Sequence, residues 1–277
     1  MSGQGLNFTS IFGKYIMFFY LKFVLLSFRT PTDIHRIFNA LRLPPIWDIG
    51  NGGRVQGLEA FCIFLYFCAR PRTLLDIGDK FGRSESLVSR IVSTAFKFVY
   101  FRIKSILFWD QARLTLGKLN EYGDTIARKS GINHGDIKYI GMIDGTFRRC
   151  ARPTEHQEGN YSGWKHAHGI KFQGVMAPDG IMMHLGGPYQ AKMHDARILA
   201  TSGLQERLDI SVGRHRGMRI YGDAAYGSRY RWVVSALRRH QLRPPALRRR
   251  NRIMSSARIV VEWGFGLTTK YVYLLSV

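Results

Sequence analysis

The sequence predicts a mixed α/β protein in which an α-helical region precedes a sheet. Two observations carry this prediction. After residue 137, short buried stretches alternate with helical patterns, and residues 58–101 show helical spacing of their apolar side chains. The 277 residues are 45% hydrophobic, which is enough for one large or two modest domains. We expect an apolar helical region at 1–57, a helical domain at 58–136 and an α/β domain at 137–277.

The first 57 residues contain one strongly apolar run at residues 11–28. This run is near the lower length limit for a membrane span and contains Lys14 and Lys22. We therefore expect a packing helix and no membrane partner, with a membrane-associated basic protein as an alternative. A short helix is predicted at residues 31–39, with Thr32 as its N-cap.

Residues 58–101 are predicted to form three helices. The second is short and ends at Gly82, and the third is amphipathic, with Ser84 as its N-cap. This order outlines a helix-turn-helix unit, in which Ser89 and Arg90 would face a DNA groove. A plain helical subdomain is the equally weighted alternative.

The α/β domain is predicted to begin with a buried strand, "IKYIGMIDGTF". A hairpin follows at residues 165–189, with its turn at residues 178–180. We expect one helix in "DARILATSGLQERL", a strand in "RIYGDAAYG", and further helices in "SRYRWVVSALRRHQ" and "SARIVVEWGFGLTTKYV".

Three acidic residues stand out in this domain. Asp144 and Asp223 each close a short apolar stretch, and Glu262 lies in an amphipathic stretch that could point at them. Acids that converge without a paired Lys or Arg repel one another unless a cation holds them. All-oxygen ligands favour Mg²⁺ or Mn²⁺, and two such ions can activate a water for phosphodiester cleavage. The plainer interpretation is that each Asp is a turn or cap residue.

The charge of the chain favours a polyanionic partner. Lys and Arg number 41 against 19 Asp and Glu, a net charge of +22. Nucleic acid is the first expectation and an anionic membrane surface the second. Ten arginines and no acid lie between Asp223 and Glu262, and the run Arg248, Arg249 and Arg250 would bind DNA phosphates. The three cysteines match no paired zinc motif and suit a reducing compartment.

Five blocks occur in order: "MIDGTFRRCARP", "YSGWKHAHGIKFQGVMAPDGIMMHLGGPY", "MHDARIL", "YGDAAYG" and "ARIVVEWGFG". Together they resemble the Harbinger-type DDE transposases and the endonucleases derived from them. The resemblance implies an RNase H-like fold, a mixed sheet flanked by helices. It implies that Asp144 is the first catalytic and metal-binding acid, on the first strand. Asp223 would be the second, at the end of the fourth strand, and Glu262 the third, on a late helix.

The same resemblance points to further site residues. His194 and Asp195 match another block of the family, and Asp195 is either an N-cap or an auxiliary ligand. Lys165 and His166, expected on the strand after the first, are candidate phosphate contacts. The arginines that follow Asp144 are expected to meet the DNA.

The resulting hypothesis is a divalent-metal-dependent DNA endonuclease or transposase that acts on transposon ends and target DNA. A Myb-like DNA-binding partner, a homo-oligomer and nuclear localisation are implied by the resemblance alone. The alternative is a catalytically inactive, transposase-derived DNA-binding protein. Family members usually carry more helix after the third acid. We therefore expect the catalytic domain to be truncated at its C-terminus, which would loosen Glu262.

Overall fold

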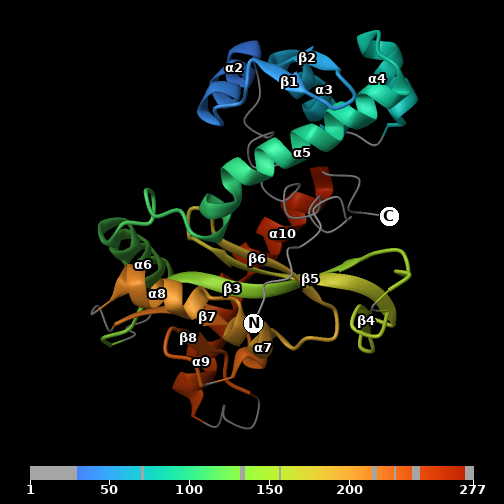
Figure 1. Cartoon of the computed structure of the whole chain (residues 1–277). Helices are drawn as coiled ribbons and strands as arrows, with labels where there is room; N and C mark the ends of the chain where they lie inside the picture. Colours follow the sequence, from blue (N-terminus) through green and yellow to red (C-terminus); the bar gives the residue numbers. More distant parts are fainter. Residues whose placement is uncertain are drawn as a thin grey trace. The chain divides into compact units, whose positions relative to one another are not determined.

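The computed structural model describes residues 30–69, 72–131, 135–155, 157–213, 217–227, 229–238 and 244–271. The apolar run at residues 11–28 lies outside them. The chain forms two compact units, one of residues 1–104 with 267–277 and one of residues 105–266 (Figure 1). The sequence prediction placed the domain boundary at residue 136. Within the described ranges, no helix is long and apolar enough to cross a membrane.

The first unit begins with helix α2, Pro31–Ala40, followed by a small hairpin of β1, Ile46–Asp48, and β2, Arg54–Gln56. Thr30 caps α2, and the predicted cap at Thr32 was wrong. A proline at the first helical position, Pro31, forces the preceding residue into an extended conformation, which a cap residue requires. The Asp33 carboxylate accepts from the Thr30 backbone N–H at 3.0 Å, which completes the cap.

Three helices follow, as predicted: α3, Gly57–Ala69, α4, Leu74–Phe81, and α5, Glu85–Phe108. Gly82 ends α4 in a left-handed conformation, with φ of 63°, and the Ser84 hydroxyl accepts from the Leu87 N–H at 3.3 Å. Ser89 is exposed, whereas the Arg90 guanidinium donates to the Gly50 carbonyl at 3.2 Å. Their contact with DNA stays a prediction.

The second unit is built on a mixed sheet, as predicted. Its strands are β3, Lys138–Arg149, β4, Tyr161–Ser162, β5, Ala167–Met176, β6, Met182–Gln190, β7, Met218–Gly222, and β8, Val233–Ser235. The order is β4-β5-β3-β7-β8, with β6 also paired to β5. β3 pairs antiparallel with β5 and parallel with β7, and β7 pairs parallel with β8.

Two of the predicted helices differ from the structure. Residues 229–238 form no helix but contain β8, because this segment pairs with β7 and buries Trp232 and Val233 in the core. The predicted helix at residues 195–208 is two helices, α7, Asp195–Thr201, and α8, Leu204–Val212. They are separated at Gly203, whose φ of 73° does not fit a helix.

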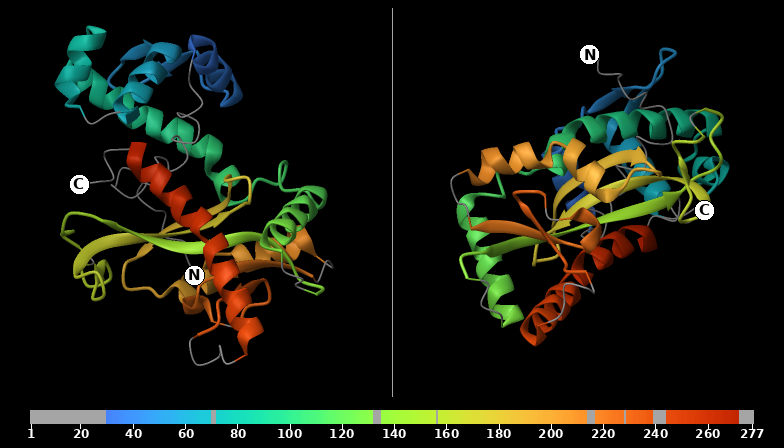
Figure 2. Two further views of the ribbon diagram at one scale, coloured as in Figure 1. Left: turned by 180° about the vertical axis from the view of Figure 1, so that it is seen from behind. Right: turned by 90° about the horizontal axis from the view of Figure 1, so that it is seen from below.

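Helices cover both faces of this sheet (Figures 1 and 2). α7 and α8 pack on the face that carries Ile143 and Val175, where most of the core lies. The opposite face carries α9, Pro245–Ala257, and the first part of α10, Ile259–Tyr271. Because adjacent residues of β3 point to opposite faces, Asp144 projects toward α10 and Gly145 faces α7.

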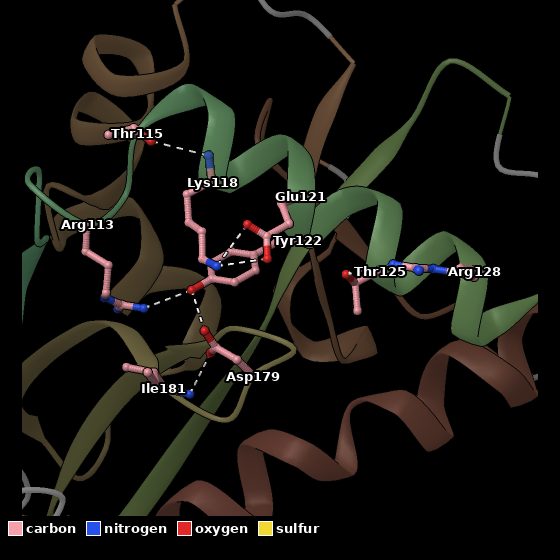
Figure 3. Close-up of polar contacts among 9 residues, drawn as sticks. All are labelled: Arg113, Thr115, Lys118, Glu121, Tyr122, Thr125, Arg128, Asp179 and Ile181. Carbon is pink, nitrogen blue, oxygen red and sulfur yellow. Dashed lines mark hydrogen bonds and ion pairs between the residues drawn. The ribbon is translucent and has the colours of Figure 1, made fainter.

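Helix α6, Leu116–Ser130, packs on β3 and is tied to the β5–β6 turn (Figure 3). The Tyr122 hydroxyl donates to the Asp179 carboxylate at 2.6 Å and accepts from Arg113 at 3.0 Å. The other Asp179 oxygen accepts from the Ile181 N–H at 2.9 Å, which confirms the predicted turn. Burial and the bond to Asp179 raise the pKa of Tyr122 to about 12, so its hydroxyl stays a donor.

Close packing of α10 on β5 requires a glycine at position 174. A Cβ on Gly174 would lie 2.7 Å from the Phe265 ring, whose place in α10 it would disturb. We predict that Gly174→Ala lowers the free energy of unfolding by about 1–3 kcal/mol, the usual effect of overpacking. Gly117→Ala is the control, because its Cβ would meet only Thr115 at 3.9 Å. Urea denaturation measures both, and equal stability of Gly174→Ala and the wild type would contradict the prediction.

Candidate active site

The strand register places Asp144 and Asp223 side by side. Met142 of β3 is opposite Tyr221 of β7, the last pair of this parallel ladder. Each aspartate lies two residues beyond its member of that pair, at the end where β7 stops. β3 itself continues past Asp144 to Arg149 along β5, two residues beyond the predicted strand. What ends near Asp144 is the pairing of β3 with β7.

Asp223 holds the turn that leaves β7. Its Oδ1 accepts from the Ala225 N–H at 2.9 Å and caps the short 3₁₀ turn Ala224–Tyr226. The turn packs so closely that there is no room for a side chain at Gly222, where a Cβ would lie 2.8 Å from both Ile143 and Tyr226. Asp223 therefore is a cap residue, as the plainer interpretation held, and it also lies beside Asp144.

Glu262 reaches the same place from the first turn of α10. The helix approaches the sheet closely, since a Cβ on Gly264 would overlap the end of Met176. Arg148 of β3 fixes the helix further by donating from Nη2 to the Phe265 carbonyl at 3.3 Å. Burial lowers the pKa of Arg148 to about 10. This arginine therefore packs against α10, and its contact with DNA stays a prediction.

Arg258 links two of the three acids, and the sequence analysis missed it. Its Nη1 lies 2.9 Å from Asp144 Oδ2, and its Nη2 lies 3.1 Å from Glu262 Oε1. The expectation that the acids converge without a paired base was therefore wrong. Residues four apart share one face of a helix, so the spacing of Arg258 and Glu262 is the signal that could have revealed the pair.

The electrostatics of Asp144 reflect the acids and the base around it. The pKa of its carboxyl is raised to about 6, mainly by burial and in smaller part by the charges of Asp223 and Glu262. Arg258 and the Gly145 N–H act in the opposite direction. The side chain of Asp144 is 17% exposed, whereas that of Glu262 is 52% exposed. The site is thus a cluster of acids that is buried at Asp144 and open at Glu262.

Residues 143–277 match the protein-family model described as DDE superfamily endonuclease. This segment belongs to the DDE superfamily endonucleases. The mixed sheet flanked by helices is the RNase H-like arrangement that the resemblance implied. No curated protein and no solved structure gives a significant match to the chain.

Endonucleases of the DDE superfamily generally use divalent metal ions. Within the residues that the structure describes, no group of three His, Cys, Asp or Glu is already arranged to hold a metal. The donors nevertheless suit one, because carboxylate oxygens are the ligands of Mg²⁺ and Mn²⁺. The Arg258 guanidinium already places a positive charge between the carboxylates of Asp144 and Glu262.

The auxiliary residues His194 and Asp195 lie at the start of α7. His194, not Asp195, is the N-cap residue, and its side chain makes no cap hydrogen bond. Asp195 pairs with Lys171 at 3.2 Å on the sheet face opposite Glu262. A Cβ on Gly145 would lie 2.9 Å from its carboxylate, so Asp195 is close to the backbone that follows Asp144. Its role as a metal ligand stays a prediction.

A groove of about 910 Å³ opens on this α7 face of the DDE domain. We call it the basic groove; its charged and aromatic lining residues are Phe147, Arg149, Trp164, Lys165, Lys171, Lys192, His194 and Asp195. Trp164 is 86% exposed. Lys165 and His166 lie in the turn between β4 and β5, so their predicted place on a strand was wrong. The turn includes His166 in a left-handed conformation, with φ of 47°.

The three predicted DNA-contacting arginines of α9 have different surroundings. Arg248 and Arg249 are exposed. Arg250 is partly buried and donates to the Tyr139 hydroxyl at 2.9 Å, which ties α9 to β3. Contact of these residues with DNA stays a prediction.

The raised pKa of Asp144 predicts a pH-dependent loss of stability. The Asp144 carboxyl of the folded chain holds its proton more tightly than the same group in the unfolded chain, where an Asp titrates near pH 4. The free energy of unfolding therefore falls as the pH rises from about 4 to about 6, by about 3 kcal/mol for a two-unit shift of the pKa. Asn does not titrate, so the free energy of unfolding of Asp144→Asn should rise by about this amount, relative to that of the wild type, when the pH is raised from 4 to 7. Urea denaturation in EDTA at both pH values measures it, and a pH-independent difference would contradict the shift.

Proposed function

We propose that the chain is a divalent-metal-dependent DNA endonuclease or transposase of Harbinger type. The observation that supports the proposal is that Asp223 and Glu262 lie near enough to Asp144 to raise its pKa, within a segment that matches the DDE endonucleases. These three residues would hold the metal. When bound, Mg²⁺ or Mn²⁺ supplies Lewis-acid activation of a water and stabilises charge at the phosphate.

The chain itself would position these groups. The Ala225 N–H fixes one oxygen of Asp223, which sets the direction of the other. Pairing of β3 with β7 keeps Asp144 beside it, and the packing of α10 presents Glu262 from the open side. Action on transposon ends and target DNA, a Myb-like partner, self-association and nuclear localisation belong to the same proposal and rest on the resemblance.

The basic groove is proposed to bind DNA. Within the described residues, no ion pair involves Arg149 or Lys165, so their charges are available to phosphates. Trp164 presents an open aromatic face on which an unpaired base could stack. The groove is lined by Gly145, the residue after Asp144, and lies on the sheet face opposite the one toward which Asp144 projects.

The second candidate is a catalytically inactive DNA-binding protein. The observation that favours it is the Arg258 ion pair, which places a protein cation against two of the three acids. Such a protein would keep the basic groove and lose the chemistry. A cleavage assay separates the two candidates.

Supercoiled plasmid should be nicked by the full chain with Mg²⁺ or Mn²⁺. We expect Asp144→Asn to slow nicking by about 100- to 1,000-fold, the scale of removing one group that stabilises the transition state. Asp124→Asn is the control, since this carboxylate lies on the surface of α6 and is 61% exposed. Equal nicking by Asp144→Asn and wild type would refute the catalytic assignment. DNA binding without cleavage by the wild type would favour the inactive protein.

Two variants of the basic groove should weaken DNA binding in different ways. Arg149→Gln should lower the slope of log affinity against log salt by about 0.7 for single strands, because one phosphate contact is lost. Trp164→Ala should weaken binding by about 5- to 100-fold and leave the slope unchanged, because stacking is not ionic.

Fluorescence anisotropy with single-stranded DNA in EDTA measures both effects without cleavage. Lys118→Gln is the matched control, because it removes a charge that pairs with Glu121 on α6. If Arg149→Gln and Trp164→Ala bind like this control at every salt concentration, the basic groove is not the DNA site.

A further inference from the structure

We propose that Arg258 is the built-in counter-ion of the acid site, and that a divalent ion binds by displacing its guanidinium from Asp144. This inference rests on the proposed function, since it assumes that Asp144 is a metal ligand. In this proposal Arg258 is a positioning residue. Its side chain holds Asp144 and Glu262 together before a metal binds. The guanidinium also opposes metal binding until it moves away from Asp144.

The position of Arg258 in the chain suits this role. It lies at the junction of two helices, after the last residue of α9 and before the first of α10. Its backbone remains helical, with φ of −65° and ψ of −21°. The side chain therefore shares a face with Glu262, and it crosses from α10 to β3 to reach Asp144. One guanidinium joins the helix that carries the third acid to the strand that carries the first.

The pair is too buried to be an incidental surface contact. The side chains of Arg258 and Asp144 are 20% and 17% exposed, and both N–O distances are short. Exposed ion pairs contribute little to stability, whereas removing one partner of a buried pair leaves a charge without compensation. Here the loss of Arg258 would leave Asp144 facing the charges of Asp223 and Glu262 with its nearest cation removed.

The same charge opposes a metal. A guanidinium is not deprotonated in proteins, so Arg258 cannot yield to a divalent ion by losing its charge. It can yield only by moving away from Asp144 Oδ2. Glu262 is the more exposed partner, and it gives the guanidinium an alternative anchor at the open side of the site. Metal binding therefore requires that the ion pair between Arg258 and Asp144 breaks.

The test measures Mn²⁺ affinity of the full chain by the electron paramagnetic resonance signal of free Mn²⁺. We expect Arg258→Gln to bind Mn²⁺ about 10-fold more tightly than the wild type, with Arg258→Lys between them. Arg252→Gln is the matched control, because it removes one positive charge from an exposed position of α9. It reports the effect of net charge alone. In EDTA, Arg258→Gln should melt at a lower temperature than Arg252→Gln.

The outcomes separate this inference from the proposed function. If Asp144→Asn loses Mn²⁺ binding but Arg258→Gln and Arg252→Gln bind equally, the metal site stands and the inference fails. Weaker Mn²⁺ binding by Arg258→Gln also overturns it, since Arg258 would then support the metal ligands. If Asp144→Asn binds Mn²⁺ like the wild type, the proposed metal site itself fails.

Discussion

The mutual repulsion of three carboxylates is the constraint on which this domain depends. Their charges come from β3, from the turn after β7 and from α10, and one of them is largely buried. A fold that collects such groups must hold them by forces other than their own contacts. Parallel pairing fixes the two aspartates, the packing of α10 fixes the glutamate, and a guanidinium offsets the charge.

Glycines make much of this arrangement possible. Gly222 lets the Tyr226 ring close under the turn of Asp223, and Gly174 lets the Phe265 ring approach β5. Gly145 leaves room for Asp195 on the other face. In each case a missing side chain admits a neighbour that positions an acid or lies next to one. The acids are therefore held by packing at adjacent residues, which a motif of acidic residues alone does not reveal.

The aspartates could be predicted because each ends an apolar stretch, and neighbouring strands of one sheet bring such ends together. Arg258 was missed because ten arginines in one segment look alike until the helix phase relative to Glu262 is known. The helix predicted across β8 failed for another reason. Pairing with β7 and burial of Trp232 outweigh the local preference for a helix that the sequence of this segment suggests. Lys165 and His166 were placed on a strand because the alternation of side chains does not mark where a short turn begins.

The ion pairs of Arg258 with Asp144 and Glu262 also affect how the site forms when the chain folds. The balancing charge is encoded in the polypeptide, because Arg258 pairs with both Asp144 and Glu262. Folding of the domain therefore does not depend on a divalent ion to offset the charges of these two carboxylates.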